Sequence, residues 1–245
     1  MVKPDISLII PAYNEEKCIG RVLESIRAAK EAYRDPPSIE IIVVDNYSTD
    51  NTAQIADGFG VQIVSEKERR IAAVRNTGAR IARGRIIGFL DADNTITPNM
   101  LNAIDRVMAA ENYIGGGTMI KPDRFSLGLF CTYCVTVFPA RWLMGIAGGL
   151  LFTEKATFEA LGGFDESLYC AEDSKFAWDL KAYGKQRGKR FAVISGDFVT
   201  TSTRTFDRLG DWYYFKNIPR VLLKGGRNAF KDKGLVSKFW YDVER

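Results

Sequence analysis

The feature that most constrains this chain is the alternation of short apolar runs with segments of helical periodicity along its first half. Four runs show little polar alternation, as is typical of strands buried on both faces; they lie at 6–10, 39–46, 61–66 and 85–90. The segments between them repeat apolar residues at helical spacing. The alternation predicts an α/β fold with a mostly parallel central sheet and helices on both faces.

Helix starts can be placed from capping residues. Asn14 is predicted to cap the first helix, with Glu15 and Glu16 in its first turn, where acids suit the helix dipole. Thr97 is predicted to cap a helix over 97–110, with Pro98 in its first helical position.

The second half is less regular. Residues 113–120 predict a strand, and a later strand leads into a helix that Thr153 should cap. A further helix should open at Asp173, run to Tyr183 and end at Gly184. Because the sequence shows no linker, low-complexity segment or internal repeat, we expect one continuous domain over 1–245. It comprises two halves, about 1–112 and about 113–203, and a tail over about 204–245.

Composition excludes several classes of function. The net charge of +4 is too small to indicate nucleic-acid binding. The chain contains no histidine, which excludes a Ser-His-Asp triad and histidine-ligated metals. Its four cysteines indicate no disulfide framework, and the "CTYC" segment lacks a second pair for a zinc site. With no signal peptide and no run long enough to span a bilayer, we expect a cytoplasmic protein.

The tail is basic and aromatic, with ten basic and five acidic residues between Arg204 and Arg245. Pro219 interrupts any continuous helix, and aromatic residues return at Phe239, Trp240 and Tyr241. Two interpretations stay open. The tail is an ordinary helical segment that covers the core or a subunit interface, or it contacts the inner face of the plasma membrane peripherally.

Polar residues stand where the predicted strands end. "FLDADNTI" closes a buried run with Asp91 and Asp93, and Asp45 closes an earlier run. In an extended segment Asp91 and Asp93 would face the same side, with Ala92 turned away. Ligands of open α/β sheets bind at the carboxyl ends of strands, and paired carboxylates suit Mg²⁺ or Mn²⁺. An ordinary solvated loop is the alternative.

Four segments together resemble the family 2 glycosyltransferases, inverting enzymes of the GT-A fold. They are "PAYNEE", "VVDNYSTDNT", "RNTGARIARGRIIGFLDAD" and "GGFDESLYCAEDSKFAWDL", and they cover roughly Ile6 to Leu180. The resemblance implies that residues 1–112 bind a nucleotide sugar and residues 113–203 bind the acceptor. The residues it implies for nucleotide binding are Pro11, Ala12, Tyr13, Glu15, Asp45, Arg75, Gly78, Asp91 and Ala92.

The resemblance also implies the chemistry. Asp173 would be the general base with Glu172 beside it, and Asp93, aided by Asp91, would bind a divalent metal (Mn²⁺ or Mg²⁺). The sequence departs from many relatives, which supply a histidine after the general-base helix. Thr201, Ser202 or Arg204 would stand in its place, and an arginine there would neutralise diphosphate charge. Asn46 stands where relatives often have a second acid.

We therefore expect a metal-dependent inverting glycosyltransferase, which moves a sugar from a nucleotide-diphosphate-sugar to a saccharide or lipid-linked acceptor hydroxyl. Its setting would be cell-surface glycan or glycolipid synthesis in cell envelope biogenesis. The alternatives are a polyprenyl-phosphate sugar transferase and a non-catalytic nucleotide-sugar-binding subunit. A nucleotidyltransferase is disfavoured because "PAYNEE" is acidic where a basic, glycine-rich loop is needed.

Overall fold

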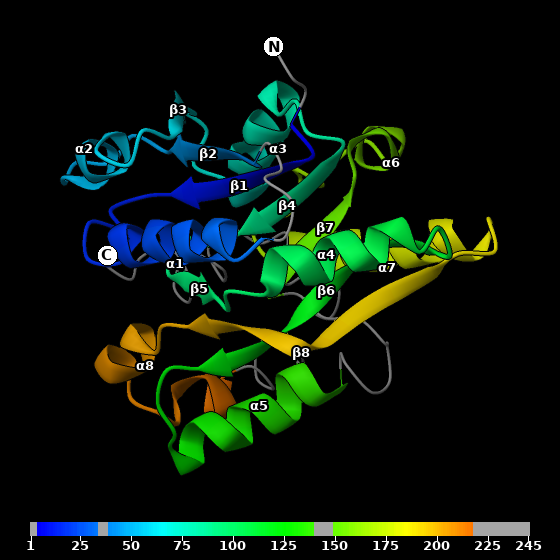
Figure 1. Cartoon of the computed structure of the whole chain (residues 1–245). Helices are drawn as coiled ribbons and strands as arrows, with labels where there is room; N and C mark the ends of the chain where they lie inside the picture. The colour runs from blue at the N-terminus through cyan, green and yellow to red at the C-terminus, as the bar shows by residue number, and fades with distance from the viewer. Residues whose placement is uncertain (1–3, 34–38, 140–148, 218–245) are drawn as a thin grey trace.

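The computed structural model describes residues 4–33, 39–139 and 149–217 (Figure 1). The strands in these ranges are β1 (Ile6–Ala12), β2 (Ile39–Asp45), β3 (Gln62–Ser65), β4 (Ile86–Leu90), β5 (Asn94–Ile96), β6 (Tyr113–Pro122), β7 (Leu150–Glu154) and β8 (Arg190–Thr201). The helices are α1 (Ile19–Glu31), α2 (Thr52–Asp57), α3 (Ile71–Ile81), α4 (Met100–Ala109), α5 (Leu127–Pro139), α6 (Lys155–Ala160), α7 (Glu172–Lys185) and α8 (Arg204–Leu209).

The described strands form one sheet in the order β3-β2-β1-β4-β7-β6-β8-β5. Strands β1 to β4 pair in parallel, as the alternating pattern predicts. Strand β7 is antiparallel to both neighbours, β8 is parallel to β6, and β5 is antiparallel to β8. The sheet is therefore parallel in its first half and mixed in its second, with β5 and β8 as strands that the sequence analysis did not predict.

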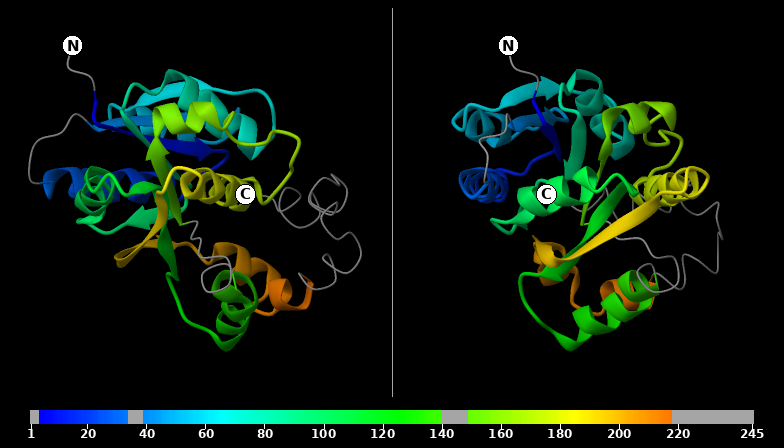
Figure 2. Two further views of the ribbon diagram at one scale, coloured as in Figure 1. Left: turned by 90° about the vertical axis from the view of Figure 1, so that its right-hand side faces the viewer. Right: turned by 45° about the vertical axis from the view of Figure 1, so that its right-hand side comes forward.

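Helices cover both faces of the sheet (Figures 1 and 2). Strand β1 shows how the faces are divided, because its alternate residues enter different cores. Leu8 and Ile10 pack with buried residues of α1 and α4, whereas Ile9 packs with α3 and α7. The mostly apolar sequence of β1, in which Ser7 is the polar exception, is thus explained by burial on both sides.

One of these cores contains a cluster of four phenylalanines that packs β4 against α6 and α7. Phe89 of β4 packs against Phe158 and Phe164, and Phe176 of α7 contacts the same two rings, with centroids 4.7 to 5.5 Å apart. Such pairs favour a fixed ring geometry. The cluster holds the start of α7 close to the carboxyl end of β4.

The predicted cap at Asn14 is wrong. Helix α1 begins at Ile19, and Glu15 and Glu16 precede it in a turn. Asn14 has φ 52°, and its side chain accepts a hydrogen bond from the backbone N–H of Thr49 (2.8 Å). The asparagine therefore shapes a loop, as its tolerance of the left-handed region allows.

The predicted caps at Thr97 and Thr153 are also wrong. Thr97 precedes the actual N-cap, Asn99, and donates to Asp197 (2.8 Å). Thr153 lies within β7 and donates to the carbonyl of Ile114 (2.7 Å). In both cases the hydroxyl is used by a strand of the second half, a tertiary contact that local sequence does not reveal.

Helix α7 begins one residue before the predicted Asp173, at Glu172, and continues past Gly184 to Lys185. Gly184 lies inside the helix, at a position where a Cβ would be 2.6 Å from Ile114 Cγ2. Close packing of α7 against β6 explains this glycine, which does not act as a helix stop.

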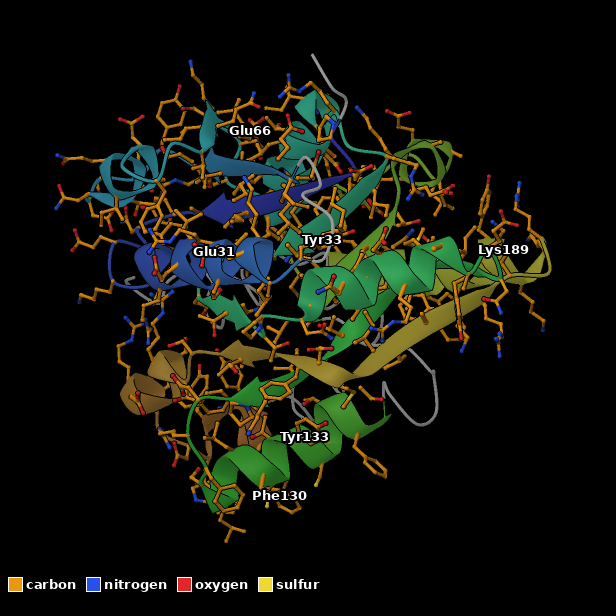
Figure 3. The ribbon with its side chains drawn as sticks, in the orientation of Figure 1. Glu31, Tyr33, Glu66, Phe130, Tyr133 and Lys189 are labelled. Atoms are coloured by element: carbon orange, nitrogen blue, oxygen red, sulfur yellow. The ribbon has the colours of Figure 1, made fainter. Side chains whose placement is uncertain are left out.

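Helix α5 differs from the other helices because none of its residues is charged (sequence LGLFCTYCVTVFP). Phe130 lies on its outer side at the edge of the molecule (Figure 3), and Phe125, Leu127 and Phe138 are also exposed. Residues 211–217 lie beside this helix (Figure 2), and Arg124 binds Asp207 and Asp211 there. No helix in the described ranges is both long and apolar enough to cross a bilayer. Pro219, Phe239, Trp240 and Tyr241 of the predicted tail lie outside the described residues.

Candidate active site

The loops after β1 and β2 are interlocked by hydrogen bonds. The backbone N–H of Glu15 donates to Thr52 Oγ1 (2.7 Å), and that of Glu16 donates to Asp50 Oδ2 (3.1 Å). In return, the backbone N–H of Asn51 donates to Glu16 Oε2 (3.2 Å). The "YNEE" and "STDNT" segments therefore shape each other at the carboxyl edge of the sheet. Short polar side chains that bond to backbone are the sequence signal for this arrangement, which was missed.

Asp45 and Asn46 end β2 at the same edge. Asp45 is buried, and both of its carboxylate oxygens lie 3.3 Å from the backbone N–H of Ser48. Asn46 donates from Nδ2 to the carbonyls of Glu66 (2.5 Å) and Glu68 (3.0 Å). An acid could not donate these bonds, so the asparagine is explained by the loop it ties down.

Tyr13 lies at the end of β1 with its ring half-buried. The guanidinium of Arg69 stands 4.7 Å from the ring centroid, and its Nη2 donates to Tyr13 Oη (3.0 Å). Pro11 and Ala12 precede it as buried strand residues. The sequence analysis did not single out Arg69.

The first of two charge clusters, the Arg75 cluster, consists of Arg75, Asp91 and Glu172. Arg75 on α3 donates from Nη2 to Asp91 Oδ1 (2.6 Å) and from Nη1 to Glu172 Oε1. Its guanidinium also stands 5.4 Å from the centroid of the Phe164 ring. The cluster links the end of β4 to the start of α7, and it places Asp91 and the Glu172–Asp173 pair on the same side of the sheet.

Burial sets the electrostatics of the Arg75 cluster. Burial alone would lower the pKa of Arg75, but the charges of Asp91 and Glu172 outweigh it and raise the pKa above its ordinary value. Burial raises the pKa of Glu172 to about 7, with a further increase from Asp173, although Arg75 opposes the shift. Both terminal nitrogens of Arg75 bind carboxylates, and its role in nucleotide binding stays a prediction.

Asp173 is the half-exposed neighbour of that buried pair. Its Oδ1 accepts a hydrogen bond from the backbone N–H of Ser174 (2.6 Å), in the first turn of α7. Glu172 points inward to Arg75, whereas Asp173 retains access to solvent and therefore to a ligand. The two adjacent acids therefore differ in their surroundings: Glu172 is buried against Arg75, and Asp173 is accessible.

The second cluster, the Arg204 cluster, consists of Arg204, Glu15 and Asp93. Arg204 Nη2 donates to Glu15 Oε1 (2.5 Å) and lies 3.9 Å from Asp93 Oδ2. Burial would lower the pKa of Arg204, but the hydrogen bond and the charge of Glu15 raise it. Of the three residues named as substitutes for the missing histidine, Arg204 is the one whose side chain forms ion pairs with two of the predicted site residues.

Asp91 and Asp93 reach these clusters from a turn. The backbone N–H of Asn94 donates to the carbonyl of Asp91 (3.0 Å), so the predicted extended conformation is wrong. The turn directs Asp91 to Arg75 and Asp93 towards Arg204, with Ala92 buried in the core between them. The two aspartates therefore face the two clusters separately.

Gly78 has a packing explanation. A Cβ at this position would lie 2.5 Å from Ile9 Cγ2 and 2.8 Å from Val44 Cγ2. Close approach of α3 to β1 and β2 requires the glycine. A separate polar hollow of about 350 Å³ lies near the start of α3, and no predicted site residue lines it; its lining residues are Glu66, Glu68, Arg70, Ala73, Arg80 and Glu166.

The carboxylates fit a metal that is shared with a ligand. Within the described ranges, no group of three or more His, Cys, Asp or Glu side chains is arranged to hold an ion alone. Mg²⁺ usually binds one or two carboxylates and completes its shell with water and substrate phosphates. Asp93, whose side chain is 27% exposed, and Asp91, whose side chain is 42% exposed, suit this mode of binding.

Similar proteins are known for both the sequence and the fold. Residues 7–127 match the family described as "Glycosyl transferase family 2". The chain is 32% identical over 116 residues to the putative glycosyltransferase EpsH of Bacillus subtilis (strain 168). This match covers 45% of this chain and 32% of that protein. It is also 32% identical over 200 residues to the uncharacterized protein MJ1222 of Methanocaldococcus jannaschii, covering 79% of this chain and 76% of that protein.

A solved structure shares the fold. The mannosyltransferase PcManGT from Pyrobaculum calidifontis, in complex with GDP-Man and Mn²⁺, superposes with a TM-score of 0.67 at 23% identity, over 96% of this chain and 69% of that chain. The chain spans about a third to a half of the length of several curated relatives. From the sequence match and the fold together, the chain belongs to glycosyltransferase family 2 and has the GT-A fold.

Proposed function

We propose that this chain transfers a sugar from a nucleoside diphosphate sugar to an acceptor hydroxyl with inversion, in a single displacement assisted by Mn²⁺ or Mg²⁺. The observation that carries the proposal is the convergence of separated acids at one edge of the sheet. Arg75 joins Asp91 to Glu172, and Arg204 joins Glu15 to Asp93. Since Asp91 and Asp93 share one turn, both clusters border the same region.

The donor's nucleoside would lie over the ends of β1 and β2. Asp45 would accept a hydrogen bond from the base, because the backbone N–H of Ser48 uses little of its capacity at 3.3 Å. Tyr13 and Arg69 would offer a flat surface for the base or ribose. Pro11 and Ala12 would form the floor of this part of the site.

The diphosphate would lie beside the 91–93 turn. Asp93, with Asp91, would hold the divalent cation, which supplies Lewis-acid stabilisation of the leaving diphosphate when bound. PcManGT, which shares the fold, contains GDP-Man and Mn²⁺. This likeness supports a nucleotide and a metal here, whereas the base and sugar of the donor are open.

Asp173 would act as the base. The acceptor hydroxyl gives its proton to the Asp173 carboxylate as its oxygen bonds to the anomeric carbon. The bond between that carbon and the diphosphate oxygen breaks, and its electron pair leaves with the diphosphate. Attack from the face opposite the leaving group inverts the anomeric centre. Glu172 would position this base by anchoring the start of α7 to Arg75.

A polyprenyl-phosphate acceptor is the second candidate, and the uncharged, exposed surface of α5 favours it (Figure 3). A phosphate acceptor is already an anion and needs little help from Asp173. The same surface would suit contact with a bilayer. A non-catalytic nucleotide-sugar-binding role is less favoured, since Asp173 is retained at an accessible helix start.

A thermal-shift screen tests the proposal. Uridine, guanosine and thymidine diphosphate sugars are each added with Mn²⁺ or Mg²⁺, and we expect at least one pair to raise the melting temperature. If no pair stabilises the protein, the proposed function is wrong. A pair that stabilises it then becomes the donor for a transfer assay, in which the anomeric configuration of the product tests inversion.

A further inference from the structure

We propose that Tyr47, in the loop after β2, contacts the base of the nucleotide donor and forms one wall of the position that receives it. The inference rests on the proposed function and adds to the donor site a residue that the sequence analysis did not single out. Two independent observations carry it: the backbone conformation of Tyr47 together with its exposure, and its place beside the acid that ends β2.

The backbone of Tyr47 is in the left-handed region, with φ 59°. A side chain with a Cβ is unfavourable there, and a bulky one is an outlier. Within the described ranges, the other non-glycine residues with positive φ are Asn14, Glu111 and Ala171, so Tyr47 is the aromatic residue of this set. Strain of this kind is concentrated at functional sites, because it persists only where the surroundings impose it.

Packing within the protein does not account for a tyrosine at this position. Tyr47 is 49% exposed, so its ring adds little to the core. Its ring faces Lys67, whose ammonium lies 5.9 Å from the ring centroid, near the outer limit of a cation–π contact. Neither burial nor this contact explains an aromatic residue on a strained backbone, whereas contact with a ligand would.

The neighbours of Tyr47 fix it at the end of the site where the nucleoside would lie. Asn46 donates from Nδ2 to two carbonyls of the 66–68 segment (2.5 and 3.0 Å), which ties the loop after β3 to the end of β2. On the other side, Ser48 Oγ accepts a hydrogen bond from the backbone N–H of Asn14 (3.0 Å), in the loop after β1. Tyr47 stands between these two anchors, so its backbone has little freedom to leave the strained conformation.

Two tyrosine–cation pairs flank Asp45, the acid proposed to bond the base. Lys67 lies over Tyr47, and Arg69, two residues further on, lies 4.7 Å from the ring centroid of Tyr13. Every base presents a π-face, and it stacks favourably on aromatic side chains and on cations that lie beside them. A base bonded to Asp45 can therefore contact an aromatic ring from each of two loops.

Removing the ring of Tyr47 should affect stability and binding differently. Glycine adopts φ 59° without strain, so Tyr47→Gly should not lower the melting temperature although it deletes a large side chain. The same change removes aromatic surface from the base, so a nucleoside diphosphate should bind more weakly. A tyrosine that only stabilised the loop would lower the melting temperature when it is removed.

The experiment compares the wild type with Tyr47→Gly and Tyr47→Phe. Thermal unfolding measures stability, and calorimetric titration with GDP, UDP and inorganic pyrophosphate, each with Mn²⁺, measures binding. Pyrophosphate carries the two phosphates without the base. Glu111→Gly is the matched control, because Glu111 is exposed, has φ 46° and lies between α4 and β6, outside the proposed site.

We expect Tyr47→Gly to bind the preferred nucleoside diphosphate about three- to tenfold more weakly, the loss expected for one aromatic stacking contact. Its affinity for pyrophosphate should be unchanged, and its melting temperature should equal or exceed that of the wild type. Tyr47→Phe keeps the ring and should keep the wild-type affinity. Glu111→Gly should melt at or above the wild-type temperature and bind every ligand as the wild type does.

Three results would each overturn the role of Tyr47: an unchanged nucleoside diphosphate affinity in Tyr47→Gly, an equal loss of pyrophosphate affinity, or a melting temperature several degrees below that of the wild type. These results leave the proposed function intact, because the wild type still binds a nucleoside diphosphate. A wild type that binds neither GDP nor UDP, with or without Mn²⁺, overturns the proposed function and the role of Tyr47 with it.

Discussion

The Arg75 and Arg204 clusters have the same composition but different surroundings. Each places one arginine between two carboxylates at the carboxyl edge of the sheet. Each arginine binds one buried glutamate and one partly exposed aspartate, but the side chain of Arg75 is 8% exposed and that of Arg204 is 31% exposed. The difference indicates that one cluster joins structural elements and the other is available to a ligand.

The largest effect should come from removing the exposed acid of the Arg204 cluster. We expect Asp93→Ala to lower kcat/KM by roughly 10³-fold, because the loss of a metal ligand removes several kcal/mol of transition-state stabilisation. Its unfolding free energy should stay close to that of the wild type. Steady-state transfer kinetics and chemical denaturation check the two expectations, with Asp57→Ala on α2 as an exposed control. Activity near the wild-type level would show that Asp93 is not a ligand.

Asp173 tests the same comparison in the Arg75 cluster, because it lies beside buried Glu172 yet is itself accessible. Asp173→Asn should reduce kcat by about 10²–10⁴-fold if the acceptor is a hydroxyl, the range expected for a general base. The loss should be much smaller if the acceptor is a phosphate. Transfer rates with saccharide and polyprenyl-phosphate acceptors distinguish the cases. A wild-type rate with a hydroxyl acceptor would exclude Asp173 as the base.

Stability should separate the two arginines. Arg75→Met leaves Asp91 and buried Glu172 without their shared cation, and we expect a loss of about 3–5 kcal/mol in unfolding free energy. Arg204→Met removes a partly exposed arginine but leaves buried Glu15 without its cation, so we expect a smaller loss of about 1–3 kcal/mol. Urea denaturation of both variants measures the difference. Equal losses would contradict the division into a structural and a ligand-binding cluster.

The remaining prediction concerns the pH dependence of stability. Burial raises the pKa of Glu172 to about 7, so the folded protein holds this proton over a range in which the unfolded chain has released it. The contribution of Glu172 to stability is therefore full below about pH 4.5 and is lost as the pH rises to about 7. Relative to Glu172→Gln, the wild type should lose about 3 kcal/mol across this range. Denaturation of both proteins at pH 4.5 and 7.5 measures this loss. If the difference in unfolding free energy between the wild type and Glu172→Gln is the same at both pH values, the pKa of Glu172 is not raised.

The parts that the sequence predicted share a physical basis. Strands β1 to β4 and the helices between them were predicted because burial on both faces leaves mostly apolar runs. The positions of Asp45, Asp91 and Asp93 at strand ends followed from the same pattern. These features depend on local sequence and on one rule of sheet architecture.

The rest depended on tertiary contacts. Strand β8 is half polar and joins the sheet through pairing with β6 and β5, which no local pattern indicates. The partners of Arg75 and Arg204 lie far along the chain, so their contrasting roles were invisible in the sequence. Thr97 and Thr153 have the composition of helix caps, yet their hydroxyls bond elsewhere.

The central claim is that the edge marked by Asp93 binds a nucleoside diphosphate together with a divalent cation. Calorimetric titration of the wild type and Asp93→Ala with GDP and UDP, each in the presence of Mn²⁺, tests it most directly. We predict that the wild type binds at least one of them and that Asp93→Ala binds it about a hundredfold more weakly or worse. Equal affinity of the two proteins, or no binding by the wild type, would contradict the account.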